Sequence, residues 1–232
     1  MIKISVVSYL NAVPFVHGLQ QYNFTAPIAI QLDTPNVCAQ KLINNTIDIG
    51  LVPVAIIPQL AFSQVITNYC IGANGKVLSV QLFSNKPLHL ITTIGLDSES
   101  NTSNKLCKLL CAKHWNITPQ FTSFSTQNDA NIIIGDRALA ALGTYPYEYD
   151  LAQAWQELTG LPFVFAAWVA NTPIAPQLIN ELNAAFAVGV TAINTLATQH
   201  ASNQYSVHDY LTKHIQYNLT PLHTQAINLF LH

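Results

Sequence analysis

Residues 161–171 read LPFVFAAWVAN, an apolar run of strand type bounded by a proline and an asparagine. A second run of this type, VLSVQLFS, spans residues 77–84. The segment between the two runs has its own alternation of strand and helix signals. We therefore expect the chain to leave one lobe, build a second lobe and return to the first. The predicted assignment is lobe 1 for residues 1–82 and 168–232, and lobe 2 for residues 83–167.

Strand and helix signals alternate from the N-terminus onward. KISVVSYL and APIAIQLD predict strands over 3–10 and 26–33, and PFVHGLQQY predicts a short helix between them. Thr34 followed by Pro35 suits the N-cap and first position of a second helix, which ends before the strand IDIGLVP. Strands separated by helices of about ten residues imply right-handed βαβ units around a mainly parallel sheet.

The middle of the chain repeats this alternation, and the remainder is expected to be helical. Residues 98–115 predict a capped helix, and residues 128–142 predict a strand, a turn and a helix. After residue 171 the patterns PQLINELNAAFAVGVTAINTLATQ, SVHDYLTKHI and PLHTQAINLFL all favour helices. A two-lobed α/β protein of this kind binds its ligand in the cleft between the lobes, where strand ends and helix N-termini face inward.

The amino-acid composition indicates which partners, cell compartment and cysteine state to expect. Half of the 232 residues are hydrophobic, 9% are charged and the net charge is -2, which gives no electrostatic case for a nucleic-acid or membrane-surface partner. Met1 leads directly into a strand pattern without a charged leader or a long apolar span, so we expect a cytoplasmic protein. Four cysteines in a chain of this length do not form a disulfide framework, and we interpret them as reduced thiols.

The stretch SYLNAVP, residues 8–14, ends the first strand and carries the first candidate residues. Ser8 and Asn11 would project from the carboxyl end of the strand into the cleft, where the Asn11 amide offers two donors and an acceptor without adding charge. Alternatively, Asn11 caps the helix that begins near Pro14. The local sequence does not choose between these two roles.

A second candidate site stands where the helix NKLCKLLCAKHW begins, after residues 100–103. Free backbone N–H groups at this end, together with the hydroxyls of Thr102 and Ser103, would form a cradle for an anion. Ordinary N-capping explains the same serine and threonine residues.

A glycine-containing loop, GANGKVLS at residues 72–79, precedes the strand that carries Ser79. Glycines let the backbone approach a ligand closely, and Lys76 would serve as a counter-ion for an anionic ligand. A plain connecting turn with a solvated lysine is the alternative. Further along, Asp136 follows a strand in IIIGDRAL and opens a helix, where either N-capping or a role in the site would account for it.

Cys107, Cys111 and His114 share one face of a predicted helix, but no second Cys or His pair stands at finger-like spacing. Apolar residues on the same face favour a core stripe over a metal site. The H-E-x-x-H, G-x-S-x-G, Walker and G-x-G-x-x-G motifs are missing as well. We therefore expect neither a metal nor another cofactor.

Five segments resemble, in the correct order, successive blocks of the chorismate dehydratase family of the futalosine route to menaquinone. They read SYLNAVPFVHGL, TIDIGLVPVAII, VLSVQLFS, ANIIIGDRAL and YDLAQAWQELTGLPFVFAAWVAN, and the resemblance covers residues 1–175. The TGLPFVFAAW and IIIGDRAL segments are the most specific because they are long and correctly ordered.

The resemblance implies a two-lobed type II periplasmic-binding-protein-like fold used as a cytoplasmic enzyme. Members of the family convert chorismate to 3-[(1-carboxyvinyl)oxy]benzoate by removing water. The family's active-site Asn matches Asn11, its strand Ser matches Ser79, and its Thr-Ser pair at a helix start matches Thr102 and Ser103. Many members have D-G-P-V where this chain reads NGKV, which leaves Lys76 either a local substitute or a surface residue.

In the reaction implied by this resemblance, loss of water makes the substrate ring aromatic. The enzyme therefore mainly has to orient the substrate, and it needs no strong acid or base. No His or Glu in the matched segments is an evident general base. We therefore expect the enolpyruvyl carboxylate of the substrate to take the ring proton, while Asn11 binds the departing hydroxyl or fixes that carboxylate. Two other functions suit the same fold: a solute-binding protein for a small carboxylate, which normally needs export, and the sister enzyme 1,4-dihydroxy-6-naphthoate synthase, whose N-terminal block differs from SYLNAVP.

Overall fold

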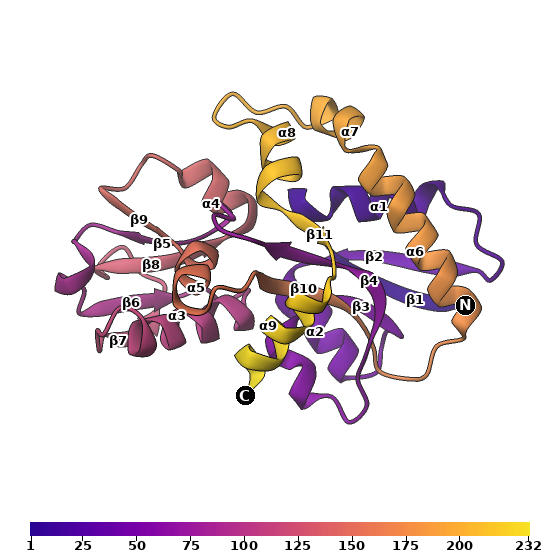
Figure 1. The fold of residues 1–232 in the computed structure, drawn as a ribbon, viewed down its shortest axis with the longest axis horizontal. Coiled ribbons are helices and arrows are strands. Elements are labelled where there is room, and N and C mark those ends of the chain that lie inside the picture. The colour runs from indigo at the N-terminus through magenta and orange to yellow at the C-terminus, as the bar shows by residue number, and fades with distance from the viewer.

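The computed structural model describes all residues, 1–232, and has two lobes that are each built on one β-sheet (Figure 1). A six-stranded sheet with the order β11-β4-β10-β3-β1-β2 forms the first lobe. A five-stranded sheet with the order β7-β6-β8-β5-β9 forms the second lobe. Helices pack against both sheets, so the predicted two-lobed α/β architecture is confirmed.

The N-terminal part of the first lobe follows the predicted alternation of strands and helices. Its elements are β1 (Ile2–Val7), η1 (Leu10–Ala12), α1 (Val13–Gln21), β2 (Ile28–Asp33), α2 (Pro35–Ile43), β3 (Ile49–Pro53) and η2 (Val54–Gln59). β1 pairs in parallel with both β2 and β3. Pro35 begins α2 as expected, and Thr34 has the extended backbone of an N-cap but makes no side-chain capping bond.

The long strand β10 makes this sheet mixed, where the sequence indicated a mainly parallel one. β10 (Phe163–Ala170) lies between β3 and β4 (Gln64–Ala73) and runs antiparallel to both. β4 has no clear strand pattern in the sequence, because exposed polar side chains such as Asn68 interrupt its apolar residues. β4 leads the chain out of the first lobe and β10 brings it back, so these neighbours necessarily run in opposite directions.

The second lobe contains the strands β5 to β9. Its elements are β5 (Val80–Ser84), η3 (Leu88–Leu90), β6 (Thr93–Leu96), α3 (Asn101–Lys113), β7 (Gln120–Ser123), β8 (Ala130–Ile134), α4 (Gly135–Ala141), β9 (Tyr147–Asp150) and α5 (Leu151–Thr159). β6 pairs in parallel with β7 and β8, whereas β5 runs antiparallel to β8 and β9. The short strands β7 and β9 and the helix α5 are additional to the prediction.

The chain changes sheet between β4 and β5 and again between α5 and β10. The expected lobe boundaries, at residues 82/83 and 167/168, fall inside β5 and β10. Each of these strands belongs wholly to one sheet, because a strand joins a sheet through its whole ladder of backbone hydrogen bonds. The sheets therefore divide the chain slightly closer to the N-terminus, within residues 74–79 and 160–162.

The C-terminal part returns to the first lobe and is mostly helical, as predicted. It comprises α6 (Pro176–Thr191), α7 (Ile193–Gln199), α8 (Val207–Asp209), the π-helical turn η4 (Tyr210–His214), β11 (Gln216–Asn218) and α9 (Pro221–Leu231). β11 is the exception, since it adds an antiparallel edge strand to β4. The helices of the structure are all too short or too polar to cross a membrane.

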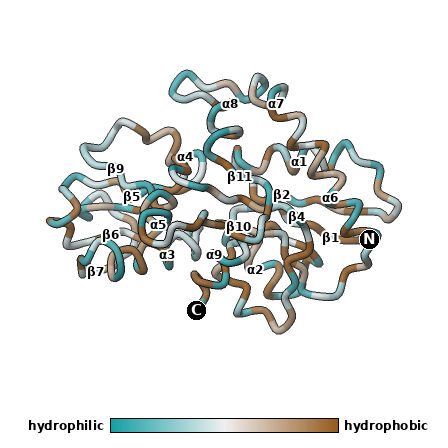
Figure 2. The backbone as a smooth tube through the Cα atoms, in the orientation of Figure 1, coloured by the Kyte–Doolittle hydropathy of each residue, from teal (hydrophilic) through white to brown (hydrophobic).

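An aromatic cluster fills the core of the first lobe. The Trp168 ring stacks on Phe186 with centroids 4.4 Å apart, and Phe15 packs edge-on against Trp168 at 5.6 Å. α1 and α6 approach closely beside this cluster, because a methyl group at Gly18 or Gly189 would collide with backbone carbonyls of the opposite helix. Figure 2 shows the hydrophobic colour along β1 and β10 and the hydrophilic colour in the outer loops.

Candidate active site

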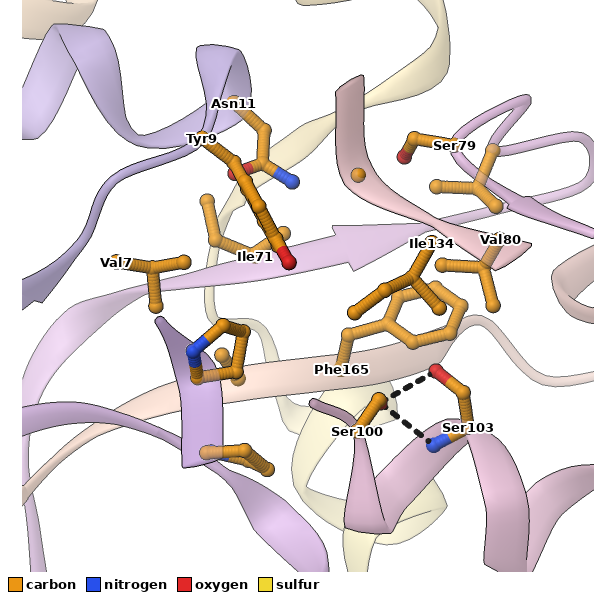
Figure 3. A pocket seen from close by; sticks show the side chains of 15 residues that line it. Val7, Tyr9, Asn11, Ile71, Ser79, Val80, Ser100, Ser103, Ile134 and Phe165 are labelled. Carbon is orange, nitrogen blue, oxygen red and sulfur yellow. Dashed lines mark hydrogen bonds between the residues drawn. The ribbon is translucent and has the colours of Figure 1, made fainter. Parts of the chain in front are cut away.

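A cavity lies between the two lobes and is lined by residues of both. Its polar lining residues are Tyr9, Asn11, Ser79, Ser100 and Ser103. The other lining residues are aliphatic or aromatic side chains, two prolines and one glycine. In Figure 3 Tyr9 and Asn11 approach the cavity from one side, and Ser79 lies on the opposite side. The cavity therefore combines apolar walls with a few hydrogen-bonding groups of no formal charge.

Asn11 lies in η1, and one of its two predicted roles, that of a helix cap, is not seen in the structure. Neither η1 nor α1 has a side-chain capping bond, so Asn11 does not cap the helix that contains Pro14. Its side chain lines the cavity, while its backbone carbonyl accepts a 3.0 Å hydrogen bond from the Tyr217 hydroxyl. The amide of Asn11 is thus presented to the cavity from a turn that is held through its backbone.

Ser79 lies in the segment that leads from β4 to β5, and its position depends on a buried carboxylate. Asp150 accepts hydrogen bonds from the backbone N–H groups of Val77 and Leu78, at 2.9 and 2.8 Å. Burial raises the pKa of Asp150, although the backbone N–H donors act in the opposite direction. The backbone carbonyl of Ser79 accepts a bond from the N–H of Gly135, which ties this segment to the start of α4.

Ser100, just before α3, and Ser103, in its first turn, bring two hydroxyl groups to the cavity, and Ser100 also caps the helix. The Ser100 hydroxyl accepts a 3.1 Å bond from the Ser103 N–H and donates to the Ser103 hydroxyl at 2.8 Å (Figure 3). Thr102 does not line the cavity, because its hydroxyl accepts a bond from the Ala55 N–H of the first lobe at 3.1 Å. Of the two predicted residues of this turn, Ser103 faces the cavity and Thr102 joins the lobes.

Tyr9 also joins the two lobes at the cavity. Its hydroxyl donates to the Glu99 carboxylate, which in turn accepts a 3.2 Å bond from Arg137. Arg137 bridges to Asp97 as well, at 3.0 Å. Burial and the neighbouring Glu99 carboxylate raise the pKa of Tyr9, so its phenol stays protonated.

The Tyr9 ring lies against Gly135, at the start of α4. Gly135 has a φ of 62°, a backbone conformation that favours glycine, and a Cβ atom built there would lie 2.8 Å from the Tyr9 ring. Both the backbone and the close approach of the aromatic ring therefore require glycine in the IIIGDRAL segment.

Besides Thr102, three predicted site residues do not line this cavity. Ser8 is exposed, and it borders a separate surface hollow together with Asp136. Asp136 does not cap α4 through its side chain; it accepts a 3.0 Å bond from the Leu10 N–H of the first lobe, and burial raises the pKa of its carboxyl group. Lys76 is exposed, and only its backbone carbonyl is engaged, by His214 Nδ1 at 2.8 Å.

The cysteine-containing face of α3 belongs to the core. Cys107 and Cys111 are buried in the main hydrophobic cluster, whereas His114 lies 3.3 Å from Glu157 near the surface. The neighbouring Cys111 thiol and, after it, burial raise the pKa of Cys107.

Sequence reasoning missed Tyr9 and Ser100 as cavity residues and Tyr210 as a partner of Ser79. Tyr9 and Ser100 stand inside segments already singled out, so their polarity beside a predicted strand end or helix start was a usable signal. Tyr210 lies 131 residues from Ser79 and carries no local signal of its role.

Known structures resemble this fold. The chain aligns with an Archaeoglobus fulgidus protein of known crystal structure at a TM-score of 0.78 and 12% identity, over 99% of this chain and 94% of that one. The aliphatic sulphonate binding protein SsuA from Escherichia coli, a periplasmic protein, aligns at a TM-score of 0.65 and 17% identity, over 99% and 88% of the two chains. The chain therefore has a periplasmic-binding-protein-like fold.

Two sequence relatives are named chorismate dehydratase. The protein from Campylobacter jejuni is 29% identical over 69% of this chain and 63% of its own length. The protein from Thermus thermophilus is 25% identical over 88% of each chain. The family described as menaquinone biosynthesis matches residues 2–232, which is nearly the whole sequence. The chain thus belongs to the menaquinone biosynthesis family.

Proposed function

We propose that this protein is a chorismate dehydratase, a carbon-oxygen lyase that converts chorismate to 3-[(1-carboxyvinyl)oxy]benzoate in the futalosine route to menaquinone. Membership of the menaquinone biosynthesis family and the two relatives of that name support the proposal. The enzyme would work in the cytoplasm, where chorismate is available to it.

The observation that carries this proposal is the chemistry of the cavity wall. No carboxylate, imidazole, amine or thiol lines the cavity, and its one ionisable group is the phenol of Tyr9, whose pKa is raised. Such a wall suits a reaction in which the substrate brings its own base. It suits less well a reaction that depends on a protein general base.

Chorismate carries such a base, which is its own enolpyruvyl carboxylate. The ring proton beside the ether is transferred to the enolpyruvyl carboxylate, and the two electrons of that C–H bond enter the ring as the neighbouring hydroxyl departs. The departing hydroxyl takes up the proton that the enolpyruvyl carboxylate has accepted and leaves as water, so the carboxylate is restored and the ring becomes aromatic. The protein has to hold the carboxylate, the ring proton and the hydroxyl in the reactive arrangement.

The polar residues of the cavity match these needs. The Asn11 amide can donate to the departing hydroxyl or to the enolpyruvyl carboxylate, and the Ser79 and Ser103 hydroxyls can donate to the substrate carboxylates. Ser103 also lies in the first turn of the 13-residue helix α3, whose N-terminal dipole favours an anion. This proposal gives no direct contact with the substrate to Lys76, Ser8 or Asp136.

Contacts between the lobes support reaction in a closed state. Tyr9 with Glu99, the Leu10 N–H with Asp136, and the Ala55 N–H with Thr102 each pair a group of the first lobe with one of the second. These bonds can form only when the lobes are together, and closure excludes water from the reacting groups.

Incubation of the purified protein with chorismate tests the proposal. We expect chorismate to be consumed while an equal amount of the aromatic enolpyruvyl product appears. Ultraviolet absorbance and chromatography measure both compounds. Heat-denatured protein is the control. Tight binding of chorismate without conversion would instead indicate a solute-binding protein, and no binding would remove chorismate as the ligand.

A further inference from the structure

Two tyrosines of the C-terminal segment reach the residues on which the proposed chemistry depends. Tyr210, in η4, donates a 2.8 Å hydrogen bond to the Ser79 hydroxyl. Tyr217, in β11, donates a 3.0 Å bond to the backbone carbonyl of Asn11. Neither tyrosine lines the cavity itself, so each acts on it through another residue.

Both tyrosines are nearly inaccessible, with exposed fractions of 1% for Tyr210 and 6% for Tyr217. A buried phenol needs a hydrogen-bond partner, and here each partner is a proposed site residue. Burial raises the pKa of both phenols, and for Tyr210 it outweighs the opposing effect of Ser79 and Asn11. Both groups therefore remain protonated donors at physiological pH.

The bond from Tyr210 determines what the Ser79 hydroxyl can offer to a ligand. A serine hydroxyl has one proton to donate and two lone pairs to accept with. Since Tyr210 supplies the proton of their shared bond, the Ser79 proton is left for another acceptor. Ser79 lines the cavity, so that acceptor can be a substrate oxygen.

The same segment holds the backbone on both sides of the cavity. Tyr217 fixes the η1 turn through the Asn11 carbonyl, and His214 Nδ1 lies 2.8 Å from the Lys76 carbonyl in the segment that precedes Ser79. The π-helical turn η4 places Tyr210 and His214 against this one segment. Turns of this rare type occur frequently at functional sites.

We propose that Tyr210 and Tyr217 are positioning residues of the active site: Tyr210 directs the Ser79 hydroxyl proton to the substrate, and Tyr217 holds the turn that presents the Asn11 amide. This inference rests on the proposed dehydratase function. It assigns to the C-terminal segment a part in catalysis in addition to its part in the fold.

A double-mutant cycle on turnover tests the role of Tyr210. Tyr210→Phe removes only the hydroxyl, and we expect it to lower kcat/KM for chorismate by about three- to tenfold, the effect of one hydrogen bond. In the Ser79→Ala background the same change should lower kcat/KM by a clearly smaller factor, because the Ser79 hydroxyl is gone and only the weaker effect of Asn11 on the Tyr210 phenol is left. A purely structural role would give the same loss in both backgrounds.

Tyr217→Phe is the second variant, and it keeps the inference testable if Tyr210→Phe folds poorly. We expect Tyr217→Phe to lower kcat by about three- to tenfold. In the Asn11→Ala background, measured under single-turnover conditions, the same change should lower the rate by a smaller factor, because no Asn11 amide is left to be positioned. Tyr205→Phe is the matched control, because its ring packs edge-on against Tyr210 and lies outside the cavity wall. Its turnover should equal that of the unmodified chain.

The outcomes separate this inference from the function on which it rests. An unmodified chain that does not convert chorismate removes the proposed function and the inference together. An active chain in which Tyr210→Phe and Tyr217→Phe turn over chorismate at the unmodified rate, or lose activity equally in every background, overturns the inference alone.

Discussion

The two walls of the cavity have similar sequence patterns, a polar residue shortly before a helix, but different local structures. On the first-lobe wall, Asn11 stands in a polar turn before α1 and caps nothing. On the second-lobe wall, Ser100 stands in a polar turn before α3 and does cap its helix, with its hydroxyl bonded to the Ser103 N–H. A polar side chain before a helix therefore keeps all its hydrogen-bonding groups for a ligand where the helix does not use them, as at Asn11.

Because of this difference, substitutions on the two walls should have opposite effects on turnover and on the stability of the fold. Asn11 should matter for turnover and little for the fold, whereas Ser100 should matter for the fold and less for turnover. The next four experiments test this division, beginning with the largest expected effect.

Asn11→Ala should give the largest change in activity. Loss of a donor aimed at a departing or charged group lowers kcat by about 100- to 1,000-fold. The free energy of unfolding should change by less than about 0.5 kcal/mol, because no capping bond is lost. Steady-state kinetics and urea unfolding measure the two quantities. Unchanged turnover would remove Asn11 from the mechanism.

Gly135→Ala should disturb the contact of the first-lobe wall with the second lobe. The added methyl group meets the Tyr9 ring, so we expect the free energy of unfolding to fall by about 1 to 3 kcal/mol more than in a matched control. Gly143→Ala is that control, since its φ of 77° imposes similar backbone strain and its Cβ meets no atom within 4 Å. Equal losses in the two variants would mean that Tyr9 does not constrain Gly135.

Ser100→Ala should affect stability more than catalysis. Removal of an N-cap side chain lowers the free energy of unfolding by about 1 kcal/mol. Turnover should fall by less than about tenfold, since Ser103 keeps its own hydroxyl at the cavity. Thermal unfolding and kinetics on the same preparation check both values. A loss of turnover as large as that of Asn11→Ala would make the two walls equivalent.

The dependence of kcat/KM on pH should be the smallest effect. The pKa of Tyr9 and that of Tyr210 are raised by burial, so both phenols stay neutral beyond their usual range near pH 10. Their ionisation favours the unfolded chain, so the stability that they contribute is present below about pH 10 and is lost only above it. We expect a flat profile between about pH 6 and about pH 9, and a sharp bell centred near pH 7 would indicate a protein general base.

Much of the fold could be read from the sequence because it depends on local patterns. The parallel strands β1 to β3 and the two runs that became β5 and β10 are continuous apolar segments bounded by turn residues. β4 and β11 escaped prediction for a physical reason: the first alternates irregularly with polar residues, and the second has only three residues. Their pairing with neighbouring strands, not their own pattern, makes them strands.

The site was predictable only in part. Asn11, Ser79 and Ser103 were identified by resemblance and do line the cavity, although their roles in catalysis remain predictions. Tyr210 reaches Ser79, and Glu99 reaches Tyr9, only through the way in which the lobes close. Such contacts join residues about 90 or more positions apart, and no local spacing rule encodes them.

In the proposed mechanism chorismate reacts between the lobes with Asn11 in contact with it. A crystal structure of the slow Asn11→Ala variant with chorismate bound shows whether the substrate occupies this position. We predict closed lobes, a substrate carboxylate within hydrogen-bond distance of the Ser79 or Ser103 hydroxyl, and the substrate hydroxyl or enolpyruvyl carboxylate beside residue 11. Chorismate bound outside this cavity, or turned with both groups away from residue 11, would contradict the account.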